Sequence, residues 1–143
     1  MAHSFRYPIR ECENYDGDSF NLTLDLGFGL VLHRKCRLEG ADTPELSGGT
    51  PRSKAAGRLA RDKARRFVAM AMADEGAVFV SETYTGKFGR PLGDFVRVSD
   101  GKSLREFLFD GNYAVPYWGG AKQDIAPLHA ANEALLVKRG EIE

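Results

Sequence analysis

The sequence predicts an α+β protein that is mainly β: a five-stranded OB-type Greek-key barrel with three helices. Two observations carry this prediction. Short segments of alternating apolar and polar residues crowd the N-terminal part and recur after one helical segment, in the order strand, strand, strand, helix, strand, strand, helix, helix. The chain also lacks the glycine-rich strand-to-helix turn of a dinucleotide-binding unit. Short strands with an intervening helix suit a small closed barrel.

The N-terminal segments predict a three-stranded meander. Residues 19–26 alternate apolar and polar side chains, and residues 30–38 resume the same period, with Leu30 on the apolar face. The turn 27–29 contains two glycines, which tolerate the positive φ angles of a hairpin. A preceding strand over 7–12 completes the meander. The two cysteines of the chain then lie on its outer strands, about 9.6 Å apart, which is too far for a disulfide.

After Pro51 the period changes to that of a helix. Alanines and Phe67 recur along one stripe, which predicts a helix beginning near Ser53. The same segment is basic, because seven Lys and Arg residues and one Asp lie between residues 52 and 66, a local charge of +6. The later elements are predicted as strands at 77–83 and 94–98 and helices at 103–109 and 124–138.

Length and charge limit the function classes. The 143 residues suit one domain over 1–143, and 20 basic against 20 acidic residues argue against a uniformly basic nucleic-acid binder. No apolar run approaches the roughly 20 residues that span a bilayer, and the first residues lack a signal-peptide core. We therefore expect a cytoplasmic monomer with no membrane partner.

Acidic residues stand in two short loops that flank the predicted hairpin. Asp16 and Asp18 surround Gly17, and Asp42 and Glu45 lie in the loop after the second hairpin strand. Each loop alone is typical of a turn. Because the start of the first strand and the end of the second are adjacent, the loops meet at one rim. Several carboxylate oxygens near one point indicate a site for a hard cation such as Ca²⁺ or Mg²⁺.

Two arginines are candidates for the same rim. Arg37 precedes the second acidic loop by a few residues, and Arg90 follows Gly89 in a glycine-rich loop. A guanidinium beside a carboxylate-held metal can bind a phosphate, because its planar fork neutralises charge on a phosphoryl oxygen. A simple surface cation remains the alternative for each.

The chemistry-bearing residues form an ordered set of motifs. They are Asp16-Gly17-Asp18-Ser19, Arg37-Leu38-x-Gly-x-Asp42-Thr43-Pro44-Glu45, Gly57-x-x-Ala60, Lys87-Phe88-Gly89-Arg90-Pro-Leu-Gly, and Gly111 with Tyr117. In order and spacing this set resembles the thermonuclease (staphylococcal nuclease-like) family. The resemblance extends from Tyr7 to Tyr117, and the Arg-Leu-x-Gly-x-Asp-Thr-Pro-Glu motif is its most specific part.

The resemblance implies a calcium-dependent endonuclease of DNA, with RNA a further candidate, that breaks the bond between phosphorus and the 5′ oxygen and leaves 3′-phosphate ends. One Ca²⁺ ion would be held by Asp18, Asp42 and the Thr43 backbone carbonyl, with Asp16 in support. The implied catalytic residues are Glu45, which orients or deprotonates the attacking water, and Arg37 and Arg90, which bind the scissile phosphate. The implied substrate contacts are Lys87, Tyr113 and Tyr117.

Some features depart from the family pattern or leave other interpretations open. Phe88 stands where the best-known member has a Tyr that helps hold a terminal phosphate, so that contact is missing. Tyr117 either stacks on a base or packs at the rim beside Trp118. The basic stripe of the first helix is either a phosphate track or a solvated face; its members are Lys54, Arg58, Arg61 and Arg65. The three histidines are widely spaced, and no catalytic role is assigned to them.

Two other functions stay open at this point. One is a non-catalytic nucleic-acid- or protein-binding OB module, and the other is a metal-sensing interaction domain. The complete set of acids and arginines favours the nuclease.

A chain with these features and no recognisable leader suits a bacterial or phage origin and an intracellular role in nucleic-acid processing. Part of the acidic excess that balances the basic helix belongs to the proposed metal site, so we expect nucleic-acid binding to depend on the metal and to weaken with salt.

Overall fold

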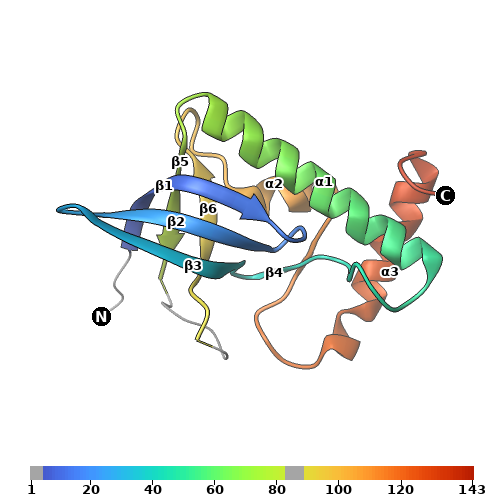
Figure 1. Ribbon diagram of the computed structural model, residues 1–143. Coiled ribbons are helices and arrows are strands. Elements are labelled where there is room, and N and C mark those ends of the chain that lie inside the picture. The colour runs from blue at the N-terminus through green and yellow to red at the C-terminus, as the bar shows by residue number, and fades with distance from the viewer. Residues whose placement is uncertain (1–4, 83–88) are drawn as a thin grey trace.

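The computed structural model describes residues 5–82 and 89–143. Five strands form a closed barrel, and three helices pack outside it (Figure 1). The barrel strands are β1 (Phe5–Asn14), β2 (Ser19–Gly27), β3 (Leu30–Leu38), β5 (Ala77–Ser81) and β6 (Leu92–Arg97). This confirms the predicted class, a mainly β protein with an OB-type barrel and three helices.

The barrel closes through one parallel pair of strands. Its order is β1-β2-β3-β6-β5, and β1 pairs with β5 to complete the circle. All neighbours are antiparallel except β3 and β6, which pair Arg37 with Leu92 and Leu38 with Gly93. The parallel contact brings the end of the first meander beside the start of β6. The segment that carries Arg90 therefore lies next to the strand that carries Arg37.

The helices keep to the predicted segments but differ at their ends. They are α1 (Pro51–Ala73), α2 (Leu104–Asp110) and α3 (Ala126–Lys138). The first begins two residues before the predicted Ser53, because the side chains of Thr50 and Ser53 cap each other's backbone N–H groups. The third begins later than predicted, because the 3₁₀ turn η1 (Lys122–Asp124) takes its first residues and Pro127 occupies its first turn.

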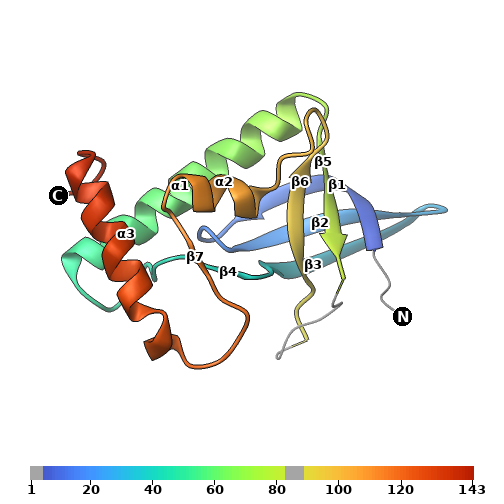
Figure 2. The same cartoon turned by 180° about the vertical axis from the view of Figure 1, so that it is seen from behind.

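A second, two-stranded sheet was not predicted from the sequence. β4 (Ala41–Asp42) pairs with β7 (Val115–Pro116), with Asp42 opposite Val115. Two-residue strands show no period, so the alternation test cannot find them. The pairing holds the C-terminal segment against the second acidic loop, and the view from behind shows α3 beside this sheet (Figure 2).

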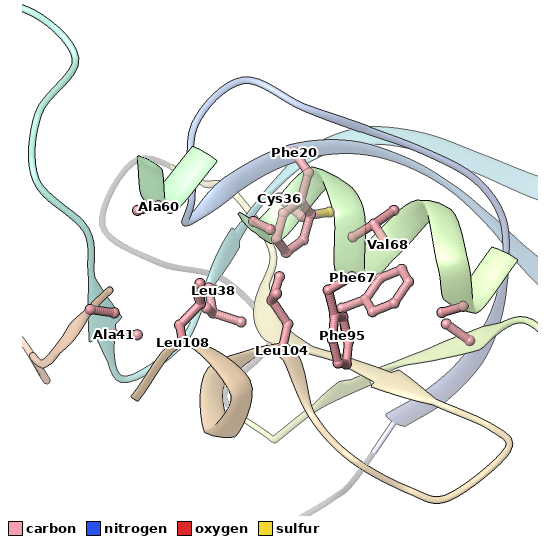
Figure 3. Packing of buried hydrophobic residues seen from close by; sticks show 14 of the residues in the cluster. Phe20, Cys36, Leu38, Ala41, Ala60, Phe67, Val68, Phe95, Leu104 and Leu108 are labelled. Atoms are coloured by element: carbon pink, nitrogen blue, oxygen red, sulfur yellow. The ribbon is translucent and has the colours of Figure 1, made fainter. Parts of the chain in front are cut away.

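The core lies inside the barrel and continues under α1 and α2. Figure 3 shows Phe20 and Cys36 from the barrel near Phe67 and Val68 of α1, and Leu38 beside Leu108 of α2. The predicted stripe on α1 is buried throughout; its members are Ala56, Ala60, Ala64, Phe67 and Ala71. Small alanines let α1 approach the barrel closely, and the ring of Phe67 packs edge-on against that of Phe95.

The tip of the β2–β3 hairpin corrects one expectation. Leu30 was predicted to share the buried face, yet its side chain is 61% exposed and Phe28 beside it is fully exposed. The hairpin extends beyond the barrel, so its tip has nothing to pack against (Figure 1).

Both cysteines are free thiols, with β2 between their strands. Within residues 5–82 and 89–143, no helix has the length and apolar character needed to span a membrane.

Candidate functional site

The two acidic loops meet at one rim of the barrel, as the hairpin topology predicts. Thr43 donates its backbone N–H to Asp18 Oδ2 at 2.9 Å, and Leu38 donates its N–H to the Asp18 carbonyl at 2.8 Å. Gly17 makes the approach possible, because a Cβ there would lie 2.6 Å from Thr43 Cγ2. The glycine of the Asp-Gly-Asp motif thus serves loop packing as well as the turn.

Asp18 is a buried carboxyl with an acidic neighbour. Its backbone N–H donates to Asp16 Oδ1 at 3.1 Å, which places the two carboxyls close together. Burial, followed by the charge of Asp16, raises the pKa of Asp18 to about 7. A cation beside Asp18 would offset both effects, since it favours the ionised form.

Arg37 lies between the two carboxylates that the sequence predicts as metal ligands. Its Nη2 is 3.1 Å from Asp42 Oδ1 and 3.6 Å from Asp18 Oδ2. The side chains of both aspartates are only 5% exposed. The two carboxylates therefore converge on a single positive group, and they would bridge a cation placed at that point.

Two residues that the sequence analysis did not assign to the site also bind Asp42. Lys122 of η1 donates to Asp42 Oδ1, and His129 Nε2 lies 2.9 Å from Asp42 Oδ2. These residues are 80 and 87 positions from Asp42 in the chain. No local pattern signals such contacts; they arise because η1 and α3 fold back beside β4.

The electrostatics of Asp42 differ from those of Asp18. Burial by itself would raise the pKa of Asp42, but hydrogen bonds from His129 and Lys122 outweigh it, and the pKa lies below its ordinary value. The carboxylate is thus charged and has cationic or hydrogen-bonding partners on both oxygens. His129 Nδ1 is buried and has no hydrogen-bond partner among the described residues, whereas Nε2 contacts Asp42.

A cleft of about 560 Å³ opens next to these carboxylates. Its lining includes the three predicted catalytic residues, Arg37, Glu45 and Arg90, together with Lys122. Glu45 is 74% exposed and its Oε1 lies 3.8 Å from Lys122 Nζ. Arg37 lies in β3 and Arg90 lies just before β6, two residues from Leu92, with which Arg37 pairs. The cleft therefore gathers three cations and two carboxylates, the partly buried Glu39 and the exposed Glu45.

Two adjacent aromatic residues form one wall of the cleft. Tyr117 is anchored, because its N–H donates to the Gly40 carbonyl and its hydroxyl donates to the Gly120 carbonyl. Lys122 Nζ lies 4.9 Å from its ring centroid. Trp118 is 70% exposed and packs over Gly40. Tyr117 thus lines the cleft. This position fits both interpretations of the residue, stacking on a base and packing at the rim beside Trp118.

Of the predicted substrate contacts, Tyr113 lies away from this cleft. Tyr113 is buried, its ring packs against Gly111 and Phe107, and its hydroxyl donates to Glu141 at 2.8 Å. The αL conformation of Asn112, with φ of 63°, directs the chain so that this ring joins the core. The structure thus places Tyr113 in the core rather than in the cleft, and its substrate contact stays a prediction. Lys87, together with Phe88, lies outside the described residues.

The carboxylates of Asp18 and Asp42 are compatible with one hard cation only after a local rearrangement. Across residues 5–82 and 89–143, no group of three or more His, Cys, Asp and Glu side chains is arranged to hold a metal ion. The nearest arrangement is the Asp18 and Asp42 pair, whose shared point is taken by Arg37. Carboxylate oxygens are the ligands that Ca²⁺ and Mg²⁺ prefer, so the chemistry of the pair fits such an ion once these contacts open.

Comparison with known proteins adds no assignment. No family model matches the chain, and no curated protein matches it significantly.

Proposed function

We propose that this protein is a divalent-cation-dependent nuclease, with Ca²⁺ as the expected ion and DNA or RNA as the substrate. The observation that supports it best is the convergence of Arg37, Arg90 and Glu45 on one open cleft beside the Asp18 and Asp42 pair. These residues come from separate segments of the chain. A cleft in which three cations outnumber two carboxylates suits a phosphodiester, which is an anion that gains charge during hydrolysis.

In the proposed reaction, water attacks phosphorus and the bond to the 5′ oxygen breaks. Glu45 takes the proton from the attacking water, and its exposure to the cleft gives it access to that water. Arg37 and Arg90 hold the phosphoryl oxygens as negative charge builds on them. The leaving 5′ oxygen takes a proton from solvent, and a 3′-phosphate remains. The bound cation would add Lewis-acid stabilisation of the phosphoryl oxygens.

A cleavage assay tests the proposal. Supercoiled plasmid and a labelled single-stranded oligonucleotide are incubated with CaCl₂, MgCl₂, MnCl₂ or EGTA. We expect cleavage with Ca²⁺, loss of cleavage with EGTA, and 3′-phosphate ends on the products. Arg37→Ala, Glu45→Gln and Arg90→Ala should each lower the rate about a hundredfold or more.

Matched variants separate the site from general charge effects. Arg10→Ala and Glu11→Gln change exposed residues of β1 and should cleave like the unmodified protein. Circular dichroism should show the same fold in every variant. Unchanged cleavage by all three site variants would contradict the proposal, as would a lack of cleavage with every metal tried.

The contacts of Asp42 favour a second candidate, a non-catalytic nucleic-acid- or protein-binding OB module. Arg37, Lys122 and His129 already satisfy both oxygens of this carboxylate. A chain that needed no metal could keep such a cluster as a structural ion-pair network. The cleavage assay and a gel-shift experiment together decide between the two. A nucleic-acid-binding module would shift the oligonucleotide but would not cleave it with any metal.

A further inference from the structure

We propose that Lys122 is the internal cation that a divalent metal must displace from Asp42, and that it thereby sets the metal affinity of the site. The inference rests on the proposed function, because it concerns the same carboxylate pair. It assigns a role to a residue that lies outside all the sequence motifs. The argument depends on which atom Lys122 contacts, how exposed its side chain is, and where it can move.

Lys122 and a metal would use the same oxygen. The Lys122 ammonium donates to Asp42 Oδ1, which is also the oxygen that faces the shared point between Asp42 and Asp18. An ammonium and a divalent cation repel each other and cannot both occupy that position. Binding of a metal at that point therefore requires Lys122 to leave Oδ1, and Arg37, whose Nη2 lies 3.1 Å from the same oxygen, must also shift.

Lys122 is the partner of Asp42 that can leave most easily. Its side chain is 51% exposed, whereas those of Arg37 and His129 are 21% and 16% exposed. His129 contacts Oδ2, so it can keep Asp42 oriented while Oδ1 changes partner. The half-exposed ammonium can exchange its contact for water at a small cost in free energy.

In its present position the Lys122 ammonium already has two other partners, which it can keep when it leaves Asp42. Glu45 Oε1 lies 3.8 Å from Lys122 Nζ, and the Tyr117 ring lies beneath the same nitrogen. Both contacts are on the cleft side of Asp42, since Glu45, Tyr117 and Lys122 all line the cleft. On release from Asp42, Lys122 would remain in the cleft and join Arg37 and Arg90 as a third cation there.

A metal can bind only those molecules in which Oδ1 is open. The apparent metal affinity is therefore reduced in proportion to the fraction of such molecules. Removing the ammonium should therefore tighten metal binding. We expect Lys122→Met to bind Ca²⁺ roughly three- to tenfold more tightly than the unmodified protein. Lys122→Arg keeps a cation in place and should bind Ca²⁺ with nearly unchanged affinity. Lys138→Met removes a positive charge from an exposed position in the last turn of α3 and serves as the matched control.

Isothermal titration of each protein with CaCl₂ alone measures these affinities without any cleavage. A second measurement follows the lysine directly: the full-length protein is acetylated with an amine-reactive ester, with and without Ca²⁺, and the modified lysines are quantified by mass spectrometry. We expect Ca²⁺ to increase acetylation of Lys122 and to leave that of Lys138 unchanged.

Each outcome decides the proposal. Tighter binding by Lys122→Met, with Lys122→Arg and Lys138→Met unchanged, supports it, and so does binding that appears only in Lys122→Met. Equal affinities, together with unchanged acetylation of Lys122, overturn it but leave the proposed function intact. Absence of Ca²⁺ binding in every protein overturns it together with the calcium site of the proposed function.

Discussion

His129 and Asp42 join α3 to the second acidic loop. Nε2 of the imidazole lies 2.9 Å from Oδ2 of the carboxylate, across 87 positions of the chain. Leu136 is the only fully buried side chain among the residues of α3, so the helix depends on a few specific contacts for its position. The His129 contact is one of these, and it couples the placement of α3 to the candidate site.

Replacing His129 should therefore loosen α3. His129→Ala leaves a buried carboxylate oxygen without its partner, and we expect the free energy of unfolding to fall by about 1–3 kcal/mol. Amide hydrogens over 126–138 should exchange faster in hydrogen–deuterium exchange. His33→Ala is the control, because His33 is an exposed residue that contacts Thr23 on the hairpin. Equal exchange over α3 in both variants would show that the contact does not hold the helix.

Gly57 should not tolerate a side chain, although it lies inside a helix. Ala is normally more stable than Gly at such a position by about 0.5–1 kcal/mol. Here a Cβ would lie 2.7 Å from the carbonyl oxygens of both Pro44 and Glu45. We expect Gly57→Ala to lower the free energy of unfolding by about 1–3 kcal/mol, as measured by urea titration.

The same substitution should affect the cleft, because the loop that it displaces carries Glu45. Cleavage should fall in Gly57→Ala even under conditions where the variant is fully folded. Ala55→Gly changes helix propensity in the same turn without this contact, and it should lose a little stability while cleaving normally. A Gly57→Ala variant as stable as the unmodified protein would disprove the close approach.

Asp94 should make stability depend on pH. Burial raises the pKa of this carboxyl in β6, even though Arg105 and Ser103 donate hydrogen bonds to it. The folded state then holds the proton more tightly than the unfolded state, so this contribution to stability is present at low pH and is lost as pH rises through the folded pKa. Relative to the unmodified protein, Asp94→Asn should gain stability as pH rises above about 4, the ordinary pKa of an Asp.

Urea titrations at several pH values measure this difference. Asp25→Asn provides the opposite case, because hydrogen bonds from the Gly27 N–H and from Arg10 lower the pKa of Asp25. A lowered pKa adds stability above the ordinary pKa, so Asp25→Asn should lose stability relative to the unmodified protein as pH rises. Parallel curves for Asp94→Asn and the unmodified protein would contradict the expected shift.

The basic face of α1 should contribute to nucleic-acid binding if the proposed function is correct. Arg58 is exposed and follows Gly57, where α1 contacts the loop of Glu45. We expect Arg58→Ala to weaken oligonucleotide binding and to reduce the slope of log K against log salt by about one. Arg10→Ala, on β1, should leave the slope unchanged. Fluorescence anisotropy at several salt concentrations measures both, and an unchanged slope for Arg58→Ala would favour a merely solvated face.

Much of the architecture could be predicted from local pattern. The alternation over 19–26 and 30–38 predicts the hairpin, and the alanine stripe predicts the buried face of α1, because side-chain period is a property of neighbouring residues. Hairpin topology also places the two acidic loops at one rim. The meeting of Asp18 and Thr43 therefore follows from the sequence once the strands are recognised.

The tertiary structure alone decided the partners of these residues. Whether Tyr113 faces the cleft or the core depends on the αL conformation of Asn112 and the packing space beside Gly111, which no spacing reveals. Likewise, Lys122 and His129 reach Asp42 only because β7 pairs with β4 and returns the C-terminal segment to the acidic loop. Long-range contacts of this kind depend on how whole elements pack, whereas strands and helices reflect the period of adjacent side chains. The sequence thus determined the barrel and its acidic rim, and the packing of the C-terminal segment determined which cations occupy that rim.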